Sequence, residues 1–240
     1  MASPGINYRR ILITRAPDQA DGMARALQAL GAETEELATI RIVPGDPADL
    51  AAALANLPPN AWLVFTSANA VRAVAAWPTT RLAAVGPATA AALAAAVRPP
   101  DLVAAQQDGL GLARALAAAG GGLAVLPRGD LATPELPAAL VAAGWRVREV
   151  VAYRTLPAEL DGAALGARLG GGDFDWVVFA SGSAFTSLAA QLPDARVLGG
   201  VRLASIGPRT SQVIRAAGFA VAAEALQPTP AGLAAAIGGT

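Results

Sequence analysis

The chain has 240 residues, of which 54% are hydrophobic and 15% charged, with 18 basic and 18 acidic side chains. This composition excludes a disordered or collagen-like chain and suits one large or two modest domains. The sequence contains no Cys, no His and no Lys, so every basic residue is Arg. It therefore offers no thiolate, imidazole or amine for nucleophilic catalysis, and no metal ligands of the Cys or His type.

Charge and hydropathy argue against nucleic acid and membrane as partners. The longest basic run is Arg9-Arg10, whereas nucleic-acid-binding surfaces are clustered and basic. The four residues 11–14 between Arg10 and Arg15 are too few for the apolar region of a signal peptide. Residues 82–97 are too few to span a bilayer and are interrupted by Gly86-Pro87. We expect a cytoplasmic protein, and a monomer because no long apolar helix face is left over.

The chain begins with a strand-like and then a helix-like pattern. Residues 11–13 are typical of a buried strand in a parallel sheet. Met23, Leu27 and Leu30 follow at the spacing of one helix face, and Gly31 ends that helix. The same order of strand, polar or Gly-containing turn and helix returns along the chain, which predicts an α/β fold with parallel sheets flanked by helices.

An internal duplication divides this pattern into two similar domains. The segment AWLVFTSANAVRAVAAW (residues 61–77) matches DWVVFASGSAFTSLAAQ (residues 175–191), with Trp62 opposite Trp176. Further along, RLAAVGPATAAALAAA matches RLASIGPRTSQVIRAA, with the same Gly-Pro turn and the same Thr. A weaker match pairs ILITRAPDQADGMARALQALG with AVLPRGDLATPELPAALVAAG. The matching Trp residues indicate core packing in both copies.

Two further stretches are β-rich and bounded by Pro, namely ELATIRIVP (residues 36–44) and REVVAYRTLP (residues 148–157). As two antiparallel strands linking the domains, they would make the first domain discontinuous. This arrangement assigns residues 1–38 and 155–240 to domain 1, 44–147 to an inserted domain 2, and 39–43 and 148–154 to linker strands. The alternative is two consecutive halves divided near Gly120-Gly121-Gly122.

Over essentially its whole length, the chain resembles the uroporphyrinogen-III synthase family. Eight segments in the family's order carry the resemblance: LITRAPDQA, WLVFTSANAV, VGPATA, VLPRGD, EVVAYRT, WVVFASGSAF, IGPRTS and PTPAGLAAAI. The resemblance implies a HemD-like fold of two Rossmann- or flavodoxin-like domains joined by a two-stranded linker. It implies a lyase of heme and tetrapyrrole biosynthesis that cyclises hydroxymethylbilane to uroporphyrinogen III, with loss of water and inversion of ring D. It also implies that neither a metal nor a cofactor is used.

The resemblance and the turn positions together predict the site residues. The substrate's carboxylates need donors, and turns after parallel strands present hydroxyls, Arg side chains and helix N-termini, here toward a cleft between the domains. The predicted substrate-binding residues are Thr14, Arg15, Thr66, Ser67, Asn69, Gly86, Thr89, Arg128, Ser181, Ser183, Gly207 and Thr210. Tyr153 matches the tyrosine of the family's linker-strand motif and is the predicted catalytic residue, since its hydroxyl can help the leaving hydroxyl depart.

Each predicted residue also has a possible role in the fold alone. The Ser and Asn residues are typical helix caps, the two Thr residues can be structural, the two Arg residues can form surface salt bridges, and Tyr153 can cover the hinge. Ala180 stands where the other repeat copy has Thr66, so one donor is missing on that side.

Two alternatives to the synthase remain open at the level of sequence. One is a non-catalytic two-domain sensor or binding protein that closes on a small anionic ligand. The other is a nucleotide-using enzyme, for which no phosphate loop is present. Gly109-Leu110-Gly111 starts like a dinucleotide-binding fingerprint but lacks its third Gly, so we discard that interpretation.

Overall fold

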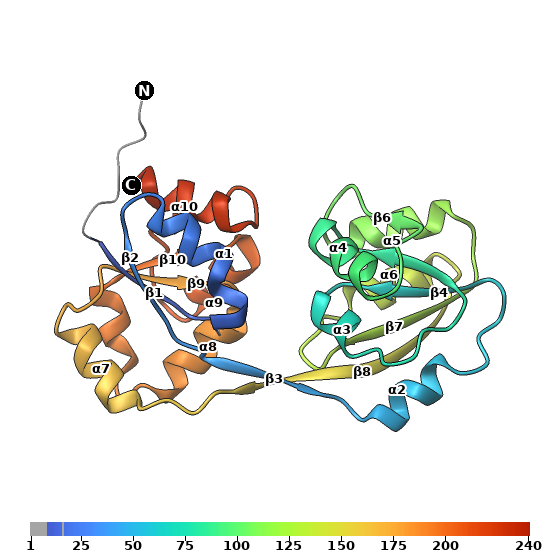
Figure 1. The fold of residues 1–240 in the computed structure, drawn as a ribbon, viewed down its shortest axis with the longest axis horizontal. Coiled ribbons are helices and arrows are strands. Elements are labelled where there is room, and N and C mark those ends of the chain that lie inside the picture. The colour runs from blue at the N-terminus through green and yellow to red at the C-terminus, as the bar shows by residue number, and fades with distance from the viewer. Residues whose placement is uncertain (1–8, 16) are drawn as a thin grey trace. The chain divides into compact units, whose positions relative to one another are not determined.

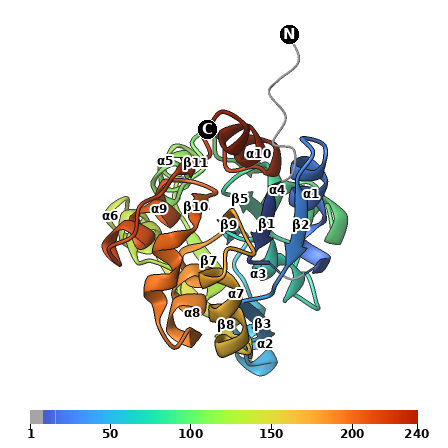
Figure 2. The ribbon, with the colours of Figure 1, turned by 90° about the vertical axis from the view of Figure 1, so that its left-hand side faces the viewer.

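The computed structural model describes residues 9–15 and 17–240 of the chain (Figures 1 and 2). The chain forms two compact units, Met1–Arg41 with Leu156–Thr240 (unit 1) and Ile42–Thr155 (unit 2). Unit 2 is thus inserted between the two chain segments of unit 1. The Gly120-Gly121-Gly122 run lies within unit 2, so the chain does not divide there into consecutive halves.

Unit 1 is built on a five-stranded sheet whose neighbouring strands all pair in parallel. Its strands, in spatial order, are β11 (Ala223–Glu224), β10 (Arg202–Ser205), β9 (Trp176–Phe179), β1 (Arg10–Ile13) and β2 (Glu33–Glu36). Its helices are α1 (Pro17–Gln28), α7 (Gly162–Gly170), α8 (Gly182–Gln191), α9 (Pro208–Ala216) and α10 (Pro230–Gly238), with a 3-10 helix at Ala195–Gly200.

The apolar runs of unit 1 are buried because helices cover both faces of the sheet. Ile11 and Ile13 pack with the buried side chains of α1 and α10. Leu12 points to the other face and packs with the buried side chains of α7, α8 and α9. Successive residues of a strand point to opposite faces, so a strand covered on both sides is apolar at every position.

Unit 2 contains the second sheet, whose order is β3-β8-β7-β4-β5-β6. These strands are β3 (Ile40–Pro44), β8 (Arg146–Pro157), β7 (Leu123–Gly129), β4 (Ala61–Phe65), β5 (Arg81–Ala84) and β6 (Leu102–Val103). Its helices are α2 (Pro47–Leu54), α3 (Ala68–Arg72), α4 (Pro87–Ala96), α5 (Gly109–Ala118) and α6 (Glu135–Ala142). Here too the buried residues form one core on each face of the sheet.

The two units have the same strand order. Strands β6-β5-β4-β7-β8 of unit 2 correspond one by one to β11-β10-β9-β1-β2 of unit 1. In unit 1 the chain enters through β1 and β2 and returns through β9, β10 and β11, which gives the flavodoxin-like order 2-1-3-4-5. In unit 2 the equivalent pair, β7 and β8, comes last in the chain. The predicted fold class of two similar parallel α/β domains is confirmed.

Matching residues of the repeat make matching contacts. The Arg81 guanidinium carbon lies 5.4 Å from the Trp62 ring centroid, and that of Arg202 lies 5.6 Å from Trp176. Each pair lies directly across two neighbouring strands. Both Trp side chains are buried, so they have the predicted core role, and each Arg adds a cation–π contact at the rim of the core.

The turns that lead into α5 and α10 are a fourth repeated piece, which comparison of the sequence with itself did not find. The N-cap of α5 is Asp108, whose carboxylate accepts from Gly111 N at 2.7 Å, and the N-cap of α10 is Thr229, whose hydroxyl accepts from Gly232 N at 3.0 Å. A Cβ atom at Gly111 would lie 2.3 Å from the Gln106 carbonyl oxygen. Gly111 is thus required by a close backbone approach in the α5 turn, and it needs no bound phosphate to explain it.

The two linker segments run antiparallel. Gly45 N donates to Ala152 O at 2.9 Å, and Ala158 N donates to Thr39 O at 3.1 Å, so residue numbers fall along one segment as they rise along the other. Strand β8 also pairs in parallel with β7 over Arg146–Tyr153. Most of the predicted linker strand is therefore an integral strand of the unit 2 sheet, because its backbone bonds to β7 as well as to β3.

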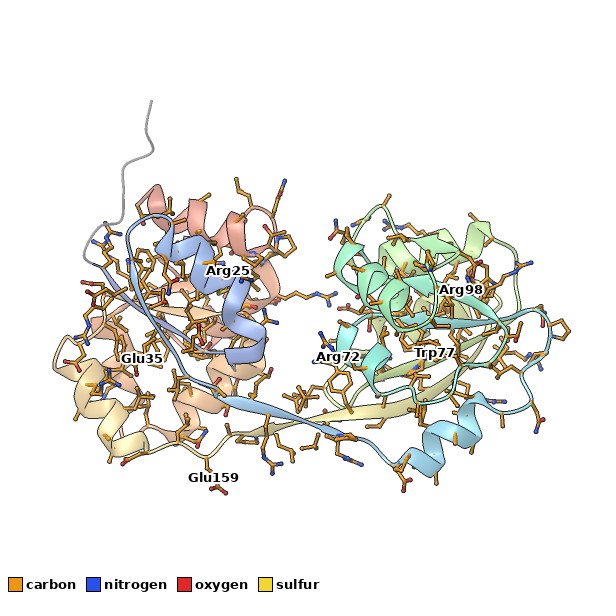
Figure 3. The ribbon with its side chains drawn as sticks, viewed as in Figure 1. Arg25, Glu35, Arg72, Trp77, Arg98 and Glu159 are labelled. Atoms are coloured by element: carbon orange, nitrogen blue, oxygen red, sulfur yellow. The ribbon has the colours of Figure 1, made fainter. Side chains whose placement is uncertain are left out.

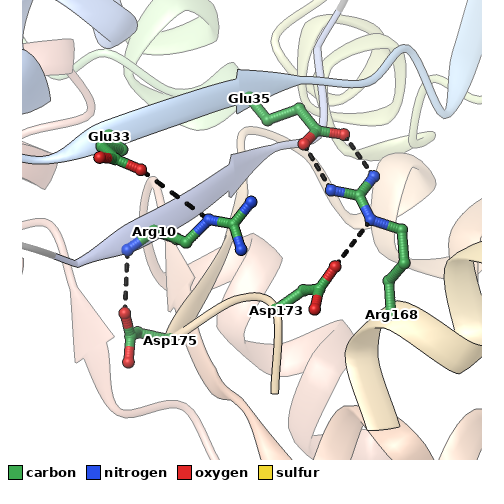
Figure 4. A network of polar contacts seen from close by, with 6 residues as sticks. All are labelled: Arg10, Glu33, Glu35, Arg168, Asp173 and Asp175. Atoms are coloured by element: carbon green, nitrogen blue, oxygen red, sulfur yellow. Dashed lines mark hydrogen bonds and ion pairs between the residues drawn. The ribbon is translucent and has the colours of Figure 1, made fainter. Parts of the chain in front are cut away.

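Charged side chains join the two chain segments of unit 1 (Figure 4). The Arg168 guanidinium donates to both carboxylate oxygens of Glu35 at 2.7 Å and to Asp173 at 3.1 Å. The Arg168 hydrogen bond holds the pKa of Glu35 below its ordinary value of 4.5, although partial burial opposes this. Arg10 N donates to Asp175 at 2.9 Å, which ties the start of β1 to the start of β9.

Candidate functional site

Parallel strands end at the same edge of a sheet, here called the carboxyl edge, and this edge carries the ligand sites of doubly wound folds. In unit 2, β7 and β4 are neighbours at the point where the strand order reverses, and β8 lies beside β7. The turn after β4 carries Thr66 and Ser67, β7 ends at Arg128 and Gly129, and β8 carries Tyr153. The topology thus gathers four of the predicted site residues at this edge: Thr66, Ser67, Arg128 and Tyr153.

Tyr153 and Ser67 are in contact. The half-buried Tyr153 donates its phenolic hydrogen to Ser67 Oγ at 3.3 Å. Ser67 is also the N-cap of α3 and accepts a second hydrogen bond from Asn69 N at 3.1 Å. Ser67 therefore has the helix-cap role that was one of its two predicted roles, and it also accepts the tyrosine hydrogen bond, which the sequence did not predict. The oxygen of Tyr153 keeps its acceptor capacity for a further group.

Asn69 continues this cluster on the surface of α3. Its side-chain oxygen accepts from Arg72 Nη1 at 2.8 Å, and Arg72 is exposed (Figure 3). Arg72 was not among the predicted site residues, because a lone Arg in a short helix carries no sequence signal for a site. Thr66 is half-buried beside Ser67. The β4–α3 turn therefore presents hydroxyl, amide and guanidinium groups together.

The Gly-Pro turns have the same geometry in both units. Gly86 and Gly207 are the N-caps of α4 and α9, with extended backbones and no side-chain cap, and Pro follows at the first helical position. Thr89 and Thr210 lie in the first turn and are 5% and 4% exposed. Such burial suits a structural role for their side chains. The sequence analysis did not predict that Gln107 lies beside this turn. A Cβ atom placed at Gly86 would lie 3.1 Å from the Gln107 side-chain oxygen.

Arg128 makes internal hydrogen bonds. It is 8% exposed, its Nη1 lies 2.5 Å from the Glu149 carboxylate, and its Nη2 donates to the Thr133 carbonyl oxygen. Arg128 therefore forms a salt bridge, which is the structural role that the sequence left open for it. The sequence could not predict this buried ion pair, because the partner Glu149 lies on β8 and only the pairing of β7 with β8 brings it beside Arg128.

The carboxyl edge of unit 1 carries the remaining predicted residues. Thr14 is buried and donates to the Val178 carbonyl oxygen at 2.8 Å, which ties the end of β1 to β9. Arg15 follows and is half-buried. Ser181 is the N-cap of α8, accepting from Ala184 N at 3.2 Å, and its Oγ lies 3.0 Å from Ser183 Oγ. Their hydroxyls form a pair at the switch point of this sheet.

Comparison with known proteins decides the family. The family model described as uroporphyrinogen-III synthase HemD matches residues 21–235. The chain belongs to this family. Its members are cyclising hydro-lyases of tetrapyrrole biosynthesis, and the chain is accordingly an enzyme that closes hydroxymethylbilane to uroporphyrinogen III with inversion of ring D.

Solved structures of uroporphyrinogen III synthases share the fold. A mutant of the enzyme from Thermus thermophilus matches with a TM-score of 0.60 and 19% identity, over 90% of this chain and 92% of that one. The wild-type enzyme from the same bacterium matches with a TM-score of 0.51 and 20% identity, over 96% of each chain. The Helicobacter pylori enzyme matches with a TM-score of 0.60 and 17% identity, over 97% of this chain and all of that one.

The polar groups at the carboxyl edges suit a synthase that binds carboxylates and moves protons. Hydroxyls, amides and Arg side chains donate to anions, and a phenol can pass a proton to a leaving oxygen. Within residues 9–15 and 17–240, no group of three or more His, Cys, Asp or Glu side chains is placed to hold a metal ion. Nor does this part of the chain contain a helix long and apolar enough to cross a membrane.

Proposed function

We propose that Tyr153 is the catalytic residue of this uroporphyrinogen-III synthase and acts on the hydroxymethyl group of the linear substrate. The observation that carries the proposal is the hydrogen bond from the Tyr153 phenol to Ser67 Oγ, at the carboxyl edge where the strand order of unit 2 reverses. Ser67 fixes the direction of the phenol, and the Tyr153 oxygen can face a bound group. For the other predicted residues, the support for a role in the site is only their position at the carboxyl edges.

In the proposed first step, the bond between the hydroxymethyl carbon and its oxygen breaks. The electron-rich pyrrole supplies the electron pair. The Tyr153 hydroxyl turns its hydrogen from Ser67 Oγ to the departing oxygen, which leaves as water, and the Ser67 hydroxyl can then donate to the phenolate. The phenolate and the cationic azafulvene that remain have opposite charges and stabilise each other.

Ring D then attacks through its substituted carbon to give a spiro-pyrrolenine. The bond from that carbon to the methylene of ring C breaks, which leaves a second azafulvene, and the free α-carbon of ring D attacks this methylene to close the macrocycle. The proton lost from that α-carbon restores the phenol. The protein holds the chain so that the substituted carbon of ring D is the one that reacts first.

The substrate's carboxylates are bound, in this proposal, by hydroxyls, Arg side chains and backbone N–H groups of both units. The residues assigned to binding are Thr14, Arg15, Thr66, Ser67, Asn69, Gly86, Thr89, Arg128, Ser181, Ser183, Gly207 and Thr210. Among them the exposed or half-buried groups of the β4–α3 and β9–α8 turns are the best placed for direct contact. Arg128, Thr14, Thr89 and Thr210 are buried and act through the turns in which they lie.

The test is to incubate the purified protein with freshly generated hydroxymethylbilane in the presence of a metal chelator, and to separate the oxidised products by isomer. Predominantly type III product is expected. The uncatalysed reaction gives the type I isomer, so type I product alone would contradict the proposal. In that case binding of the linear tetrapyrrole without turnover would favour the sensor or binding-protein alternative.

We also propose that the enzyme is a cytoplasmic monomer, on the grounds given for the sequence. Sedimentation equilibrium is expected to give the mass of a single chain over the concentration range used for assays. A mass of two chains would contradict the monomer. Fractionation of the source cells is expected to place the protein with the soluble cytoplasmic fraction, and recovery with membranes would contradict the assignment.

A further inference from the structure

The parallel pairing of β7 with β8 is irregular next to Tyr153. Arg128 faces Val151, but the next residue of β7, Gly129, faces Tyr153, so one step along β7 corresponds to two along β8. Such a β-bulge changes which side chains face each side of the sheet, and bulges beside active sites often re-aim a side chain. In this bulge Ala152 is buried in the core, and Tyr153 follows as a half-buried residue.

Because Gly129 has no side chain, the Tyr153 ring can pack directly against it. A Cβ atom at Gly129 would lie 2.7 Å from the Tyr153 Cζ atom and 2.8 Å from its hydroxyl oxygen. The hydroxyl-bearing end of the ring therefore rests directly on the Gly129 backbone. Since any side chain at this position would push the phenol away, the glycine is required for space.

Asp130 makes hydrogen bonds to the backbone of β8 on both sides of Arg154, the residue after Tyr153. Its own N–H donates to the Tyr153 carbonyl oxygen at 3.2 Å, and its Oδ1 accepts from Thr155 N at 2.9 Å. Thr155 is the last residue of unit 2 before the chain passes to unit 1. Asp130 thus holds β8 at the point where its pairing with β7 has ended.

We propose that Gly129 and Asp130 are positioning residues of the synthase, which set the place of the Tyr153 phenol against Ser67. The proposal rests on the catalytic role of Tyr153 proposed above. Gly129 supports the tip of the ring, Asp130 holds the backbone of β8, and Ser67 binds the hydroxyl. Neither Gly129 nor Asp130 needs to touch the substrate, because both act through Tyr153.

Kinetics of type III product formation test the proposal. Gly129→Ala is expected to lower kcat about tenfold and Asp130→Ala about fivefold, with KM changed less than about twofold, because misplacement of a catalytic group slows the chemical step. Asp130→Asn keeps an oxygen that can accept from Thr155 N and should restore kcat to within about twofold of the wild type. When Gly129→Ala or Asp130→Ala is combined with Tyr153→Phe, kcat should fall no further than in Tyr153→Phe alone. The effects of residues that act through one group are not additive.

Fluorine NMR measures the position of the ring directly. The chain has two Tyr residues, so Tyr8→Phe protein labelled with 3-fluorotyrosine gives a single signal from Tyr153. This signal should move in Gly129→Ala and in Asp130→Ala and return toward its original position in Asp130→Asn. The matched control is Asp46→Ala, an exposed aspartate of unit 2 whose Oδ1 accepts from Ala48 N at 2.7 Å. It should change neither the signal nor kcat.

The outcomes separate this proposal from the one on which it rests. An unmoved fluorine signal in folded Gly129→Ala and Asp130→Ala overturns the positioning role. A moved signal together with full activity of Tyr153→Phe removes the catalytic role of Tyr153 and leaves the positioning of the ring established. Thermal unfolding monitors the fold of each variant, and if Gly129→Ala does not fold, the two Asp130 variants carry the test.

Discussion

The β4–α3 turn of unit 2 and the β9–α8 turn of unit 1 are copies of one another with different polar partners. Ser67 and Ser181 both cap a helix, but Ser67 receives the Tyr153 phenol at 3.3 Å, whereas Ser181 pairs with Ser183 at 3.0 Å. The reason lies in the neighbouring strands. β7 and β8 have seven and twelve residues, whereas their counterparts β1 and β2 have four each. Duplication therefore supplied the same turn twice, and the longer strand pair of unit 2 added the tyrosine.

The largest expected effect tests whether the two units are independent. Phe65 is fully buried in unit 2, and Phe65→Ala should lower the free energy of unfolding of that unit by about 3–5 kcal/mol. Unit 1 contains a single tryptophan, Trp176, so its indole N–H signal reports unit 1 alone during a urea titration. We expect the three other indole signals to disappear at lower urea while Trp176 stays folded. Simultaneous loss of all four would show that the units unfold as one.

Removal of the phenolic hydroxyl tests the difference between the two turns. Tyr153→Phe should lower kcat about 100-fold, equivalent to about 2.7 kcal/mol of transition-state stabilisation, with little change in KM. The ring still packs on Gly129 and the core, so the melting temperature should change little. Steady-state assay of the type III isomer measures the effect. A kcat within twofold of the wild type would rule out a catalytic phenol.

The repeated glycines of α5 and α10 test what the two units share. Added Cβ atoms at Gly111 and Gly232 would lie 2.3 and 2.4 Å from the Gln106 and Gln227 carbonyl oxygens. Ala at either position should cost about 1–3 kcal/mol of stability, although Gly→Ala in a helix is ordinarily stabilising. The control is Gly121→Ala, where an added Cβ meets nothing within 4 Å, and which should stay within about 0.5 kcal/mol. Equal stabilities of all three variants in urea would contradict this.

The two serine caps offer a matched pair of smaller changes. Ser67→Ala and Ser181→Ala each remove an N-cap and should each cost about 1 kcal/mol of stability. Ser67→Ala should in addition lower kcat about fivefold, because the phenol loses its acceptor, whereas Ser181→Ala should act on KM. Urea unfolding and steady-state kinetics of the two proteins measure this. Equal losses of kcat would contradict the proposed difference between the turns.

The smallest expected effect is the pH dependence of unit 1. Because the folded pKa of Glu35 is lower than its unfolded value, ionised Glu35 stabilises unit 1 above about pH 4.5, and this contribution is lost as the pH falls through the folded pKa. For a half-exposed pair it amounts to less than about 1 kcal/mol and weakens with salt. In Glu35→Gln, the stability measured by urea unfolding should fall less than in the wild type between pH 6 and pH 3. Parallel curves would contradict this.

Several features of the site were visible in the sequence. Its turns follow apolar runs, and the predicted caps Ser67 and Ser181 are the N-caps of α3 and α8. The other two predicted caps, Asn69 and Ser183, lie inside the first turns of these helices instead. The motif around Tyr153 predicted a strand, and Tyr153 lies on β8. Arg72, Gln107 and Asp130 were missed, because an exposed polar residue in a short helix or loop resembles any other surface residue.

The sequence by itself determined the alternation of strands and helices, the duplication and the order of the family's segments, because these depend on residues close together in the chain. Only the tertiary structure decided that Tyr153 reaches Ser67, 86 residues away, and that Arg128 pairs with Glu149. These contacts depend on which strands are neighbours and on the register between them, including the bulge at Gly129. Register is set by the packing of the whole sheet, so a local pattern cannot specify which side chains meet across it.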